Sequence, residues 1–483
     1  MDDFLSFIEW EDLQQNEHLI RGEFYIDGKL QENLKTISIS RGGSYKLQGK
    51  LICVGELDLN VGDEQVAGSI ANPHRIEVRS EEMCRYILFP CYFGGKQRSF
   101  NVNDNMTKLE IDIITFQVDK LFSEDNPYQL TEWYINGPLD LQFSRSTEIE
   151  SSQKYTINRN DYQQNIEFEI PGYSKMSFDY VLVNLPNYKF IIKYVPKDYD
   201  PDWSHKIGIE YRKEFGLIPD EDEREAIAEI VSFIFGRHLL NTGYTTYDEK
   251  NFIIKQRSIN PWGNNQEHIC SNASHSPMEI DRENIENILN YLVPQYLKSR
   301  DSYNLSNVLW RYWIADDLPL GTNLPLFANG IEILSAAWFS TNNSKTKGVY
   351  IEKKKFDKLM SENFEKIQNS LEGIEYADRI LNRIKNSYNM GANEKLDFFF
   401  NEIDLPVGEV EKKAIRERNR MIYSSYTNDD DDKSILLSKY TKVYRTFFHR
   451  VILKILKYEN MYIDYSVSGF PNKNINVVVG EEN

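Results

Sequence analysis

The chain has 483 residues, which allows two or three domains and enough length to bury a sizeable core without metal or disulfide support. With 41% hydrophobic, 27% charged and 13% aromatic residues, the composition excludes an intrinsically disordered or collagen-like chain. The formal net charge of −18 argues against a protein that coats nucleic acid without regard to its sequence.

The residue pattern also excludes a membrane-spanning protein and a small protein held together by disulfides. No apolar run approaches the roughly 18 residues of a transmembrane helix, and the acidic first residues do not resemble a targeting leader. The four cysteines form no CxxC pair, and Cys84 and Cys91 with His74 upstream lack the spacing of zinc ligands. We therefore expect a cytoplasmic protein with reduced thiols, no metal, no cofactor and no membrane contact.

The first part of the chain predicts β-structure. Apolar residues alternate with polar ones between Tyr45 and Cys53, as in a strand with one buried face, and similar short stretches recur up to Lys206–Tyr211. Turn clusters such as Arg41-Gly42-Gly43 separate them. We expect an antiparallel β-rich domain, sandwich-like or barrel-like, over residues 1–218.

The pattern changes to helical spacing near residues 215–220. Pro219-Asp220 is typical of a helix start, and residues 219–483 are expected to form an all-α domain. Further helices are predicted at Ile285–Leu297, Asn304–Ala315, Leu326–Phe339, Phe356–Ser370, Tyr376–Ser387, Glu409–Ser424 and Ile435–Tyr458. The fold class is therefore α+β, with the β part first.

Basic residues gather at the end of this acidic chain. From Lys433 to Lys457 there are seven Lys or Arg and no Asp or Glu, and Lys442 belongs to this stretch. On the preceding helix Arg416, Asn419, Arg420 and Tyr423 share one face at the spacing i, i+3, i+4 and i+7, with Arg418 beside it. Arginine forks suit phosphate oxygens, and an aromatic ring can stack on a base. The alternative is a solvated charged face.

The next helix offers a second pair. Arg445 and His449 are i, i+4 neighbours, and an antiparallel hairpin of the two helices would bring them toward the first cluster. The alternative for His449 is a histidine packed beside the apolar stripe of its helix.

The segment Arg418-Asn419-x-x-x-Tyr423 resembles the RNxxxH signature of HEPN domains, which are helical domains of many RNA-cleaving toxins and defence proteins. Further strings resemble the ApeA type of HEPN protein along nearly the whole chain. These are Leu47-Gln48-Gly49-Lys50-Leu51, Phe233-Ile234-Phe235-Gly236-Arg237, Asn329-Gly330-Ile331-Glu332-Ile333-Leu334, Phe448–Leu456 and Tyr462-Ile463-Asp464-Tyr465. The resemblance implies an antiphage protein of abortive infection that cleaves RNA without metal as a homodimer or higher homo-oligomer.

One position departs from the signature, because Tyr423 stands where the family has histidine. Cleavage needs a base for the ribose 2′-hydroxyl and a cation for the charged phosphorane. The resemblance assigns the cation to Arg418 and an orienting role to Asn419. The base is then Tyr423 or His449, whose ordinary pKa lies closer to neutrality.

Other residues are secondary candidates. Glu332 lies among apolar residues and is expected either to pair with a site arginine or to occupy an ordinary exposed position. Arg237 supports the site or, with His238, caps the helix before it. The acidic run Asp429–Asp432 is a solvated loop or a place for RNA repulsion or a divalent ion.

The sequence thus predicts a defence ribonuclease in which the β domain senses a phage product, such as a phage protein, or restrains the toxin. The alternative is a catalytically silent HEPN module that binds RNA or a partner, with Tyr423 as the mark of lost chemistry.

Overall fold

A computed structural model describes thirteen stretches of the chain. They are residues 18–42, 45–55, 73–80, 84–101, 106–120, 127–139, 141–159, 164–195, 206–261, 274–319, 322–341, 348–423 and 431–480. The described residues are mostly strands first and helices afterwards, which confirms the α+β class at this level. The prediction that residues 219–483 are all-α is wrong, because Leu240–Tyr247 and Ile253–Ile259 are strands of the large sheet.

The chain folds into two compact units and crosses between them several times. A β unit comprises residues 1–221, 238–270 and 280–290, and a helical unit comprises residues 222–237, 271–279 and 291–483. The first crossing, between residues 221 and 222, lies three residues after the predicted boundary, and two later segments return to the β unit.

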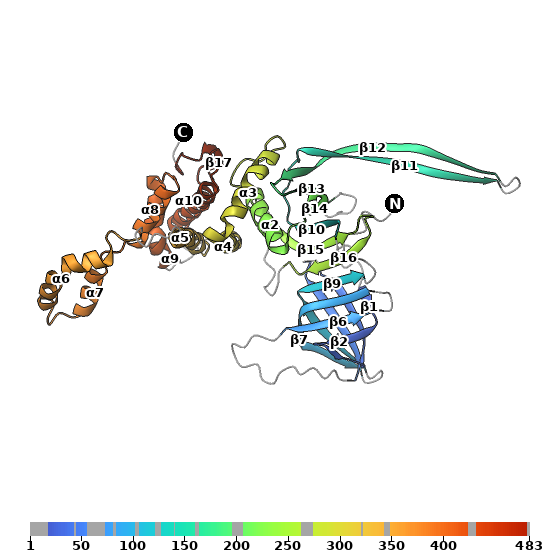
Figure 1. The fold of residues 1–483 in the computed structure, drawn as a ribbon, viewed down its shortest axis with the longest axis horizontal. Helices are drawn as coiled ribbons and strands as arrows, with labels where there is room; N and C mark the ends of the chain where they lie inside the picture. The colour runs from blue at the N-terminus through green and yellow to red at the C-terminus, as the bar shows by residue number, and fades with distance from the viewer. Residues whose placement is uncertain are drawn as a thin grey trace. The chain divides into compact units, whose positions relative to one another are not determined.

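One antiparallel sheet of sixteen strands runs through the described part of the β unit (Figure 1). The strands are β1 (His18–Ile20), β2 (Glu23–Ile26), β3 (Lys29–Leu30), β4 (Leu34–Arg41), β5 (Leu47–Val54), β6 (His74–Arg79), β7 (Cys84–Asn101), β8 (Met106–Ile113), β9 (Thr115–Lys120), β10 (Gln129–Ile135), β11 (Arg145–Arg159), β12 (Gln164–Asn184), β13 (Tyr188–Tyr194), β14 (Ile207–Gly216), β15 (Leu240–Tyr247) and β16 (Ile253–Ile259). The main path is β1-β4-β5-β8-β7-β9-β16-β15-β10-β14-β13-β12-β11, and the described strands do not close it into a ring.

Alternation of apolar residues explains the core of the first half of this sheet. In β5, Leu47, Gly49, Leu51 and Cys53 are buried while the residues between them are half-buried or exposed, as the sequence predicts. Leu47, Leu51 and Cys53 join a hydrophobic cluster with residues of β1, β2, β4, β6, β7, β8 and β9. Gly49 is required by close packing, since a Cβ there would lie 2.7 Å from the Ile111 side chain.

The two late strands join the two halves of the sheet. β16 pairs with β9, β15 pairs with both β16 and β10, and all these ladders are antiparallel. At the far end, β11 pairs only with β12, and Figure 1 shows the two as one long ribbon.

Nine helices are described, beginning with α2. They are α2 (Glu221–Phe235), α3 (Ile285–Tyr303), α4 (Leu305–Asp317), α5 (Leu324–Thr341), α6 (Lys353–Ser370), α7 (Ala377–Lys385), α8 (Ala392–Glu402), α9 (Glu409–Tyr423) and α10 (Asp431–Ile455), followed by the short strand pair β17 (Met461–Ile463) and β18 (Asn472–Asn474). The apolar stripe of α10 is buried from Leu437 to Ile455, so this helix is central to the packing of its unit. No described helix is long and apolar enough to span a membrane.

Candidate RNA site on helices α9 and α10

Helix α9 carries the HEPN-like segment on a continuous helical backbone. In its last turn with described side chains, Ala414 and Ile415 are buried and Arg416 is exposed, so this part of the helix has an inward face and an outward face. The side chains of Arg418, Asn419, Arg420 and Tyr423 lie outside the described part, and so do those of the acidic run Asp429–Asp432.

Two contacts fix how α9 and α10 pack. Glu411 near the start of α9 forms an ion pair with Arg450 near the end of α10. Three residues further along α9, the Ala414 carbonyl oxygen accepts a hydrogen bond of 3.5 Å from the Tyr444 hydroxyl, which lies six residues earlier on α10. The helices are therefore antiparallel, as in the hairpin expected from the sequence.

This register separates His449 from the motif. His449 is level with the first turn of α9, and Arg418 comes seven residues after Glu411, about 10 Å further along the axis at 1.5 Å per residue. The packing of α9 and α10 therefore does not bring His449 to the predicted Arg-Asn pair. The same two contacts place Lys442, which is exposed, level with residues 416–419 along the helix axes.

His449 lies in the interior of the helical unit. The side chain is fully buried, its Nε2 atom is 2.7 Å from the Tyr312 hydroxyl on α4, and its ring meets Phe233 of α2 edge to face. Burial, and then the positive charge of Arg445, hold the pKa of His449 well below its ordinary value. These contacts support the packing alternative, and its role as a base for RNA is not supported by any described contact.

Arg445 also turns inward, toward a cluster of polar side chains that no pattern in the sequence indicates. Its Nη1 atom donates to Nε2 of His275 at 2.9 Å, and its Nη2 atom donates to Asp316 at 2.5 Å. His275 Nδ1 lies 3.2 Å from the other Asp316 oxygen, which closes a ring of three groups. Burial alone would raise the pKa of Asp316, but hydrogen bonding from His275 and the charge of Arg445 lower it. The guanidinium of Arg445, which was predicted to bind RNA, is thus paired with the carboxylate of Asp316.

The two supporting residues have different surroundings. Gly236 ends α2 in the left-handed region with φ of 64°, and the amide of Arg237 donates to the Ser232 carbonyl oxygen at 3.1 Å. This is the Schellman arrangement of a helix end, which supports the capping alternative for Arg237. The Arg237 side chain is buried, and Glu332 on α5 is half-buried.

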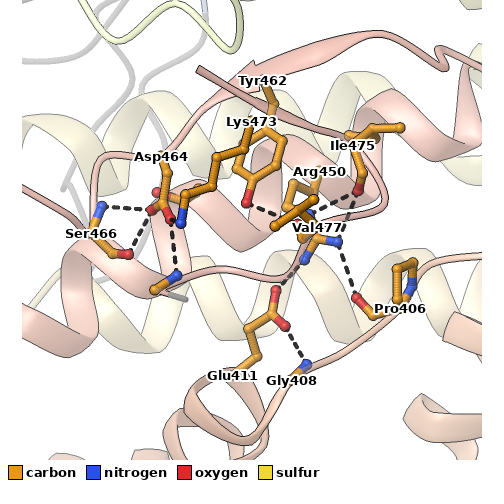
Figure 2. Close-up of polar contacts among 12 residues, drawn as sticks. Pro406, Gly408, Glu411, Arg450, Tyr462, Asp464, Ser466, Lys473, Ile475 and Val477 are labelled. Atoms are coloured by element: carbon orange, nitrogen blue, oxygen red, sulfur yellow. Dashed lines mark hydrogen bonds and ion pairs between the residues drawn. The ribbon is translucent and has the colours of Figure 1, made fainter. Parts of the chain in front are cut away.

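A second buried network fixes the C-terminal segment against α9 and α10 (Figure 2). Arg450 donates to the Ile475 and Pro406 carbonyl oxygens at 2.9 and 3.0 Å, in addition to its ion pair with Glu411. Burial raises the pKa of Glu411 to about 7, against the opposing effects of Arg450 and of the Gly408 amide. These groups are too enclosed to meet a substrate, so they serve the architecture that holds α9 in place.

Nearby, Asp464 is the centre of a third set of buried contacts (Figure 2). Its carboxylate accepts hydrogen bonds from the Ser466 hydroxyl at 2.6 Å and from the Gly480 amide at 2.9 Å, and lies 3.1 Å from Lys473 Nζ. Asp464 belongs to the Tyr462–Tyr465 string that carries part of the family resemblance, and in this structure it orders the turn after β17.

The described residues contain no group of three or more His, Cys, Asp or Glu side chains arranged to hold a metal ion. Comparison of the chain with protein-family models, with curated proteins and with solved structures finds no match. The likeness to HEPN proteins therefore remains a resemblance of motifs.

Proposed function

We propose that the helical unit binds RNA along α9 and α10 and cleaves it without metal, as an antiphage protein of the HEPN kind. The observation that carries the proposal is that both α9 and α10 carry exposed basic side chains. Arg416 is exposed on α9, the segment Arg418–Tyr423 continues the same helix, and Lys442 is exposed on α10 level with residues 416–419. Arg416 and Lys442 place exposed positive charge on these two helices of an acidic chain, which suits a phosphate backbone.

In the proposed reaction a base removes the 2′-hydroxyl proton and the resulting 2′-oxygen attacks the adjacent phosphorus. The bond from phosphorus to the 5′-oxygen breaks, and that oxygen takes up a proton. Products are a 2′,3′-cyclic phosphate and a 5′-hydroxyl. We assign charge stabilisation to Arg418, orientation to Asn419 and proton removal to Tyr423, since His449 is buried away from this face.

The test uses the purified full-length chain with total RNA, with and without EDTA, and reads product ends. Arg418→Ala and Tyr423→Phe should each lower the cleavage rate by about 10²–10⁴-fold, while Tyr423→His should preserve or raise it. Arg383→Ala is the matched control, because Arg383 is an exposed helical arginine on α7. Cleavage abolished by EDTA, or unchanged in Tyr423→Phe, would contradict the assigned chemistry.

A second function is favoured by one observation. Of the two described histidines in the helical unit, His449 is buried and His275 is engaged with Asp316 and Arg445, so neither is presented to RNA. A catalytically silent module that binds RNA or a partner fits this arrangement. It predicts salt-dependent RNA binding that Arg416→Ala and Lys442→Ala weaken, with intact RNA recovered after long incubation.

For the β unit we propose the sensing or restraining role, with a phage product as trigger, and for the helical unit self-association. The cellular test scores growth and plaque protection together. Expression of the wild type should slow growth or protect against phage, and Arg418→Ala should lose the effect at equal soluble yield. Equal behaviour of the two chains would remove Arg418 from the mechanism.

A further inference from the structure

Arg445 is held by two acceptors close to the surface of the helical unit. Its guanidinium donates to Asp316 and to Nε2 of His275, and the exposed fractions of the Arg445, Asp316 and His275 side chains are 13%, 6% and 17%. A guanidinium can only donate, so Nε2 is the acceptor and the hydrogen of the neutral His275 ring lies on Nδ1, toward Asp316. We use the name arginine clamp for Asp316 and His275 together. Unlike the fully buried Arg450–Glu411 pair, the clamp is partly exposed to solvent.

Arg445 continues a row of basic side chains along α10. Lys439 and Lys442 are exposed, and Arg445 follows at the same spacing of three residues, on the same side of the helix. The two lysines therefore present their charge to solvent, whereas the third cation of the row is turned onto Asp316. Without the clamp, this side of α10 would carry three consecutive cations, which suits the repeated phosphates of a nucleic-acid strand.

The clamp uses only part of the guanidinium. The Nη1 and Nη2 atoms of Arg445 each donate one hydrogen bond to it, and Nε has no acceptor among the residues that the structure describes. A phosphate binds a guanidinium best through two parallel hydrogen bonds, and Nε with Nη2 forms one such edge. Asp316 takes Nη2 alone, and Nε is enclosed by the protein. A phosphate can therefore take both bonds only after the guanidinium turns away from Asp316.

The position of His275 in the chain connects the clamp to the β unit. Residues 271–279 belong to the helical unit, whereas the chain on either side of them, 238–270 and 280–290, belongs to the β unit. Within the helical unit the His275 amide donates to the Gly236 carbonyl oxygen at 3.0 Å, and the Tyr465 hydroxyl donates to that of Ser276 at 2.7 Å. A displacement of this stretch would move His275 and thereby change how Arg445 is held.

We propose that Asp316 and His275 are an autoinhibitory clamp, which holds Arg445 away from RNA in the free chain and releases it to a backbone phosphate beside Lys439 and Lys442. The proposal rests on the RNA binding along α9 and α10 proposed above. It also names the contact on which the restraining role proposed for the β unit would act. The affinity for RNA is lowered in proportion to the fraction of chains in which the clamp is closed.

The experiment measures binding of the full-length chain to a fluorescent single-stranded RNA by anisotropy over a series of salt concentrations. The RNA carries 2′-O-methyl groups, so that attack by a 2′-hydroxyl cannot consume it. Asp316→Asn should bind about 10-fold more tightly than wild type, because it frees a charge-assisted contact. The slope of log affinity against log salt should steepen by about 0.7, the value for one more phosphate contact on a single strand.

A double-mutant cycle separates release of Arg445 from a general loss of negative charge. In an Arg445→Gln background, Asp316→Asn should change the affinity by less than about 2-fold, because the released cation is absent. Asp317→Asn is the matched control, since it removes the same charge from the next position of α4, which is exposed. Its effect on affinity should also stay below about 2-fold, because an exposed charge is screened by salt.

His275→Ala is a second clamp variant, which removes one acceptor of Arg445 and leaves the Asp316–Arg445 ion pair in place. It should tighten binding by about 2–10-fold, as expected for the loss of one competing hydrogen bond. His275→Ala that folds and binds like wild type would overturn the clamp, even where Asp316→Asn does not fold. Tight binding by the double variant Asp316→Asn with Arg445→Gln would overturn it as well.

Failure of the clamp and failure of the RNA site give different results. If Arg416→Ala and Lys442→Ala weaken binding while both clamp variants bind like wild type, the RNA site stands and the clamp is excluded. If neither wild type nor any clamp variant binds RNA, both proposals are excluded. Binding that appears only in Asp316→Asn and His275→Ala, and is lost again with Arg445→Gln, would show a clamp that is almost fully closed in the free chain.

Discussion

Arg450 is the largest fully buried side chain of the protein's described part, and its charge is balanced by Glu411. Arg450→Ala removes the ion pair and leaves the buried Glu411 carboxyl and the Ile475 and Pro406 carbonyl oxygens without this donor. We therefore expect Arg450→Ala to lower the free energy of unfolding by about 3–5 kcal/mol, whereas replacing both groups by apolar residues, as in Arg450→Met with Glu411→Leu, should cost less than the single change. Urea denaturation followed by circular dichroism measures both. A larger loss in the double variant than in Arg450→Ala would show that the pair is not the source of the effect.

His449 should make the protein sensitive to mild acid. Because its folded-state pKa lies well below the unfolded value, near 6.5, the unfolded chain binds the extra proton more readily. The stability from this group is present above the unfolded pKa and is lost as pH falls below it, by up to about 1.4 kcal/mol per pH unit. The difference in unfolding free energy between wild type and His449→Gln should therefore shrink from about pH 7.5 to about pH 5.5.

Glu411 changes the free energy of unfolding in the opposite direction over the same pH range. With a folded pKa of about 7, above its ordinary value, it contributes stability below about pH 4.5 that is lost as pH rises through 7. Wild type alone shows only the sum, so the comparison with His449→Gln is needed. A pH-independent difference between these two chains would contradict the buried neutral state of His449.

For single residues, the sequence predicted which side chains of one helix are neighbours, but not which residues of other elements they contact. The i, i+4 relation of Arg445 and His449 follows from helix geometry. Their partners Asp316, His275 and Tyr312 are 129, 170 and 137 residues away, and no local pattern marks them. Interior polar contacts of this kind depend on tertiary packing, which periodicity does not encode.

Among the helices, α5 and α10 approach closely at Gly330. A Cβ added there would lie 2.9 Å from Cε2 of Phe448. Gly330→Ala should favour the isolated helix but crowd the ring, and since Phe448 is fully buried it has little room to move. We expect a net loss of about 1–3 kcal/mol in unfolding free energy. Gly373→Ala is not a suitable control because of its positive φ, whereas Gly348→Ala, with no atom closer than 3.6 Å, should be nearly neutral.

Elements with long apolar periodicity were predicted best. The helices at Glu409–Tyr423 and Asp431–Ile455 were expected within a few residues of their bounds. Helix α8 was missed, although Leu396, Phe399 and Phe400 are buried, because its apolar run is short. The Glu394 carboxylate accepts a hydrogen bond of 2.6 Å from the Gly391 amide, a helix-start signal that the sequence does contain.

For the whole molecule, we expect that fragments 1–218 and 219–483 do not fold when each is expressed alone. A chain of residues 1–218 lacks β15 and β16, which leaves β9 and β10 each with one unpaired edge. A chain of residues 219–483 carries the same two strands without their partners. Both fragments should aggregate or expose strand edges, whereas their co-expression should recover soluble material. Soluble, cooperatively folding fragments in isolation would contradict this dependence.

The overall order of β followed by α was predictable because strand and helix periods differ along the sequence. The return of residues 238–270 to the β unit was not, since pairing between distant strands has no local signature. For the candidate site, both helices were predicted, and Arg416 and Lys442, which we propose to bind RNA, are exposed on them. The inward position of Arg445 was not predicted, and that of His449 was predicted only as an alternative, because their neighbours come from α4 and from residues 271–279.

The position of β15 and β16 late in the sequence also determines when the sheet can be completed during translation. β10 ends at residue 135 and its partner β15 begins at residue 240, so about 105 residues must be translated before the ladder between them can form. At 5–20 residues per second this takes about 5–20 s, during which both halves of the sheet present open edges beside the ribosome. Slowing translation between these points should prolong that exposure and increase the share of nascent chain held by chaperones.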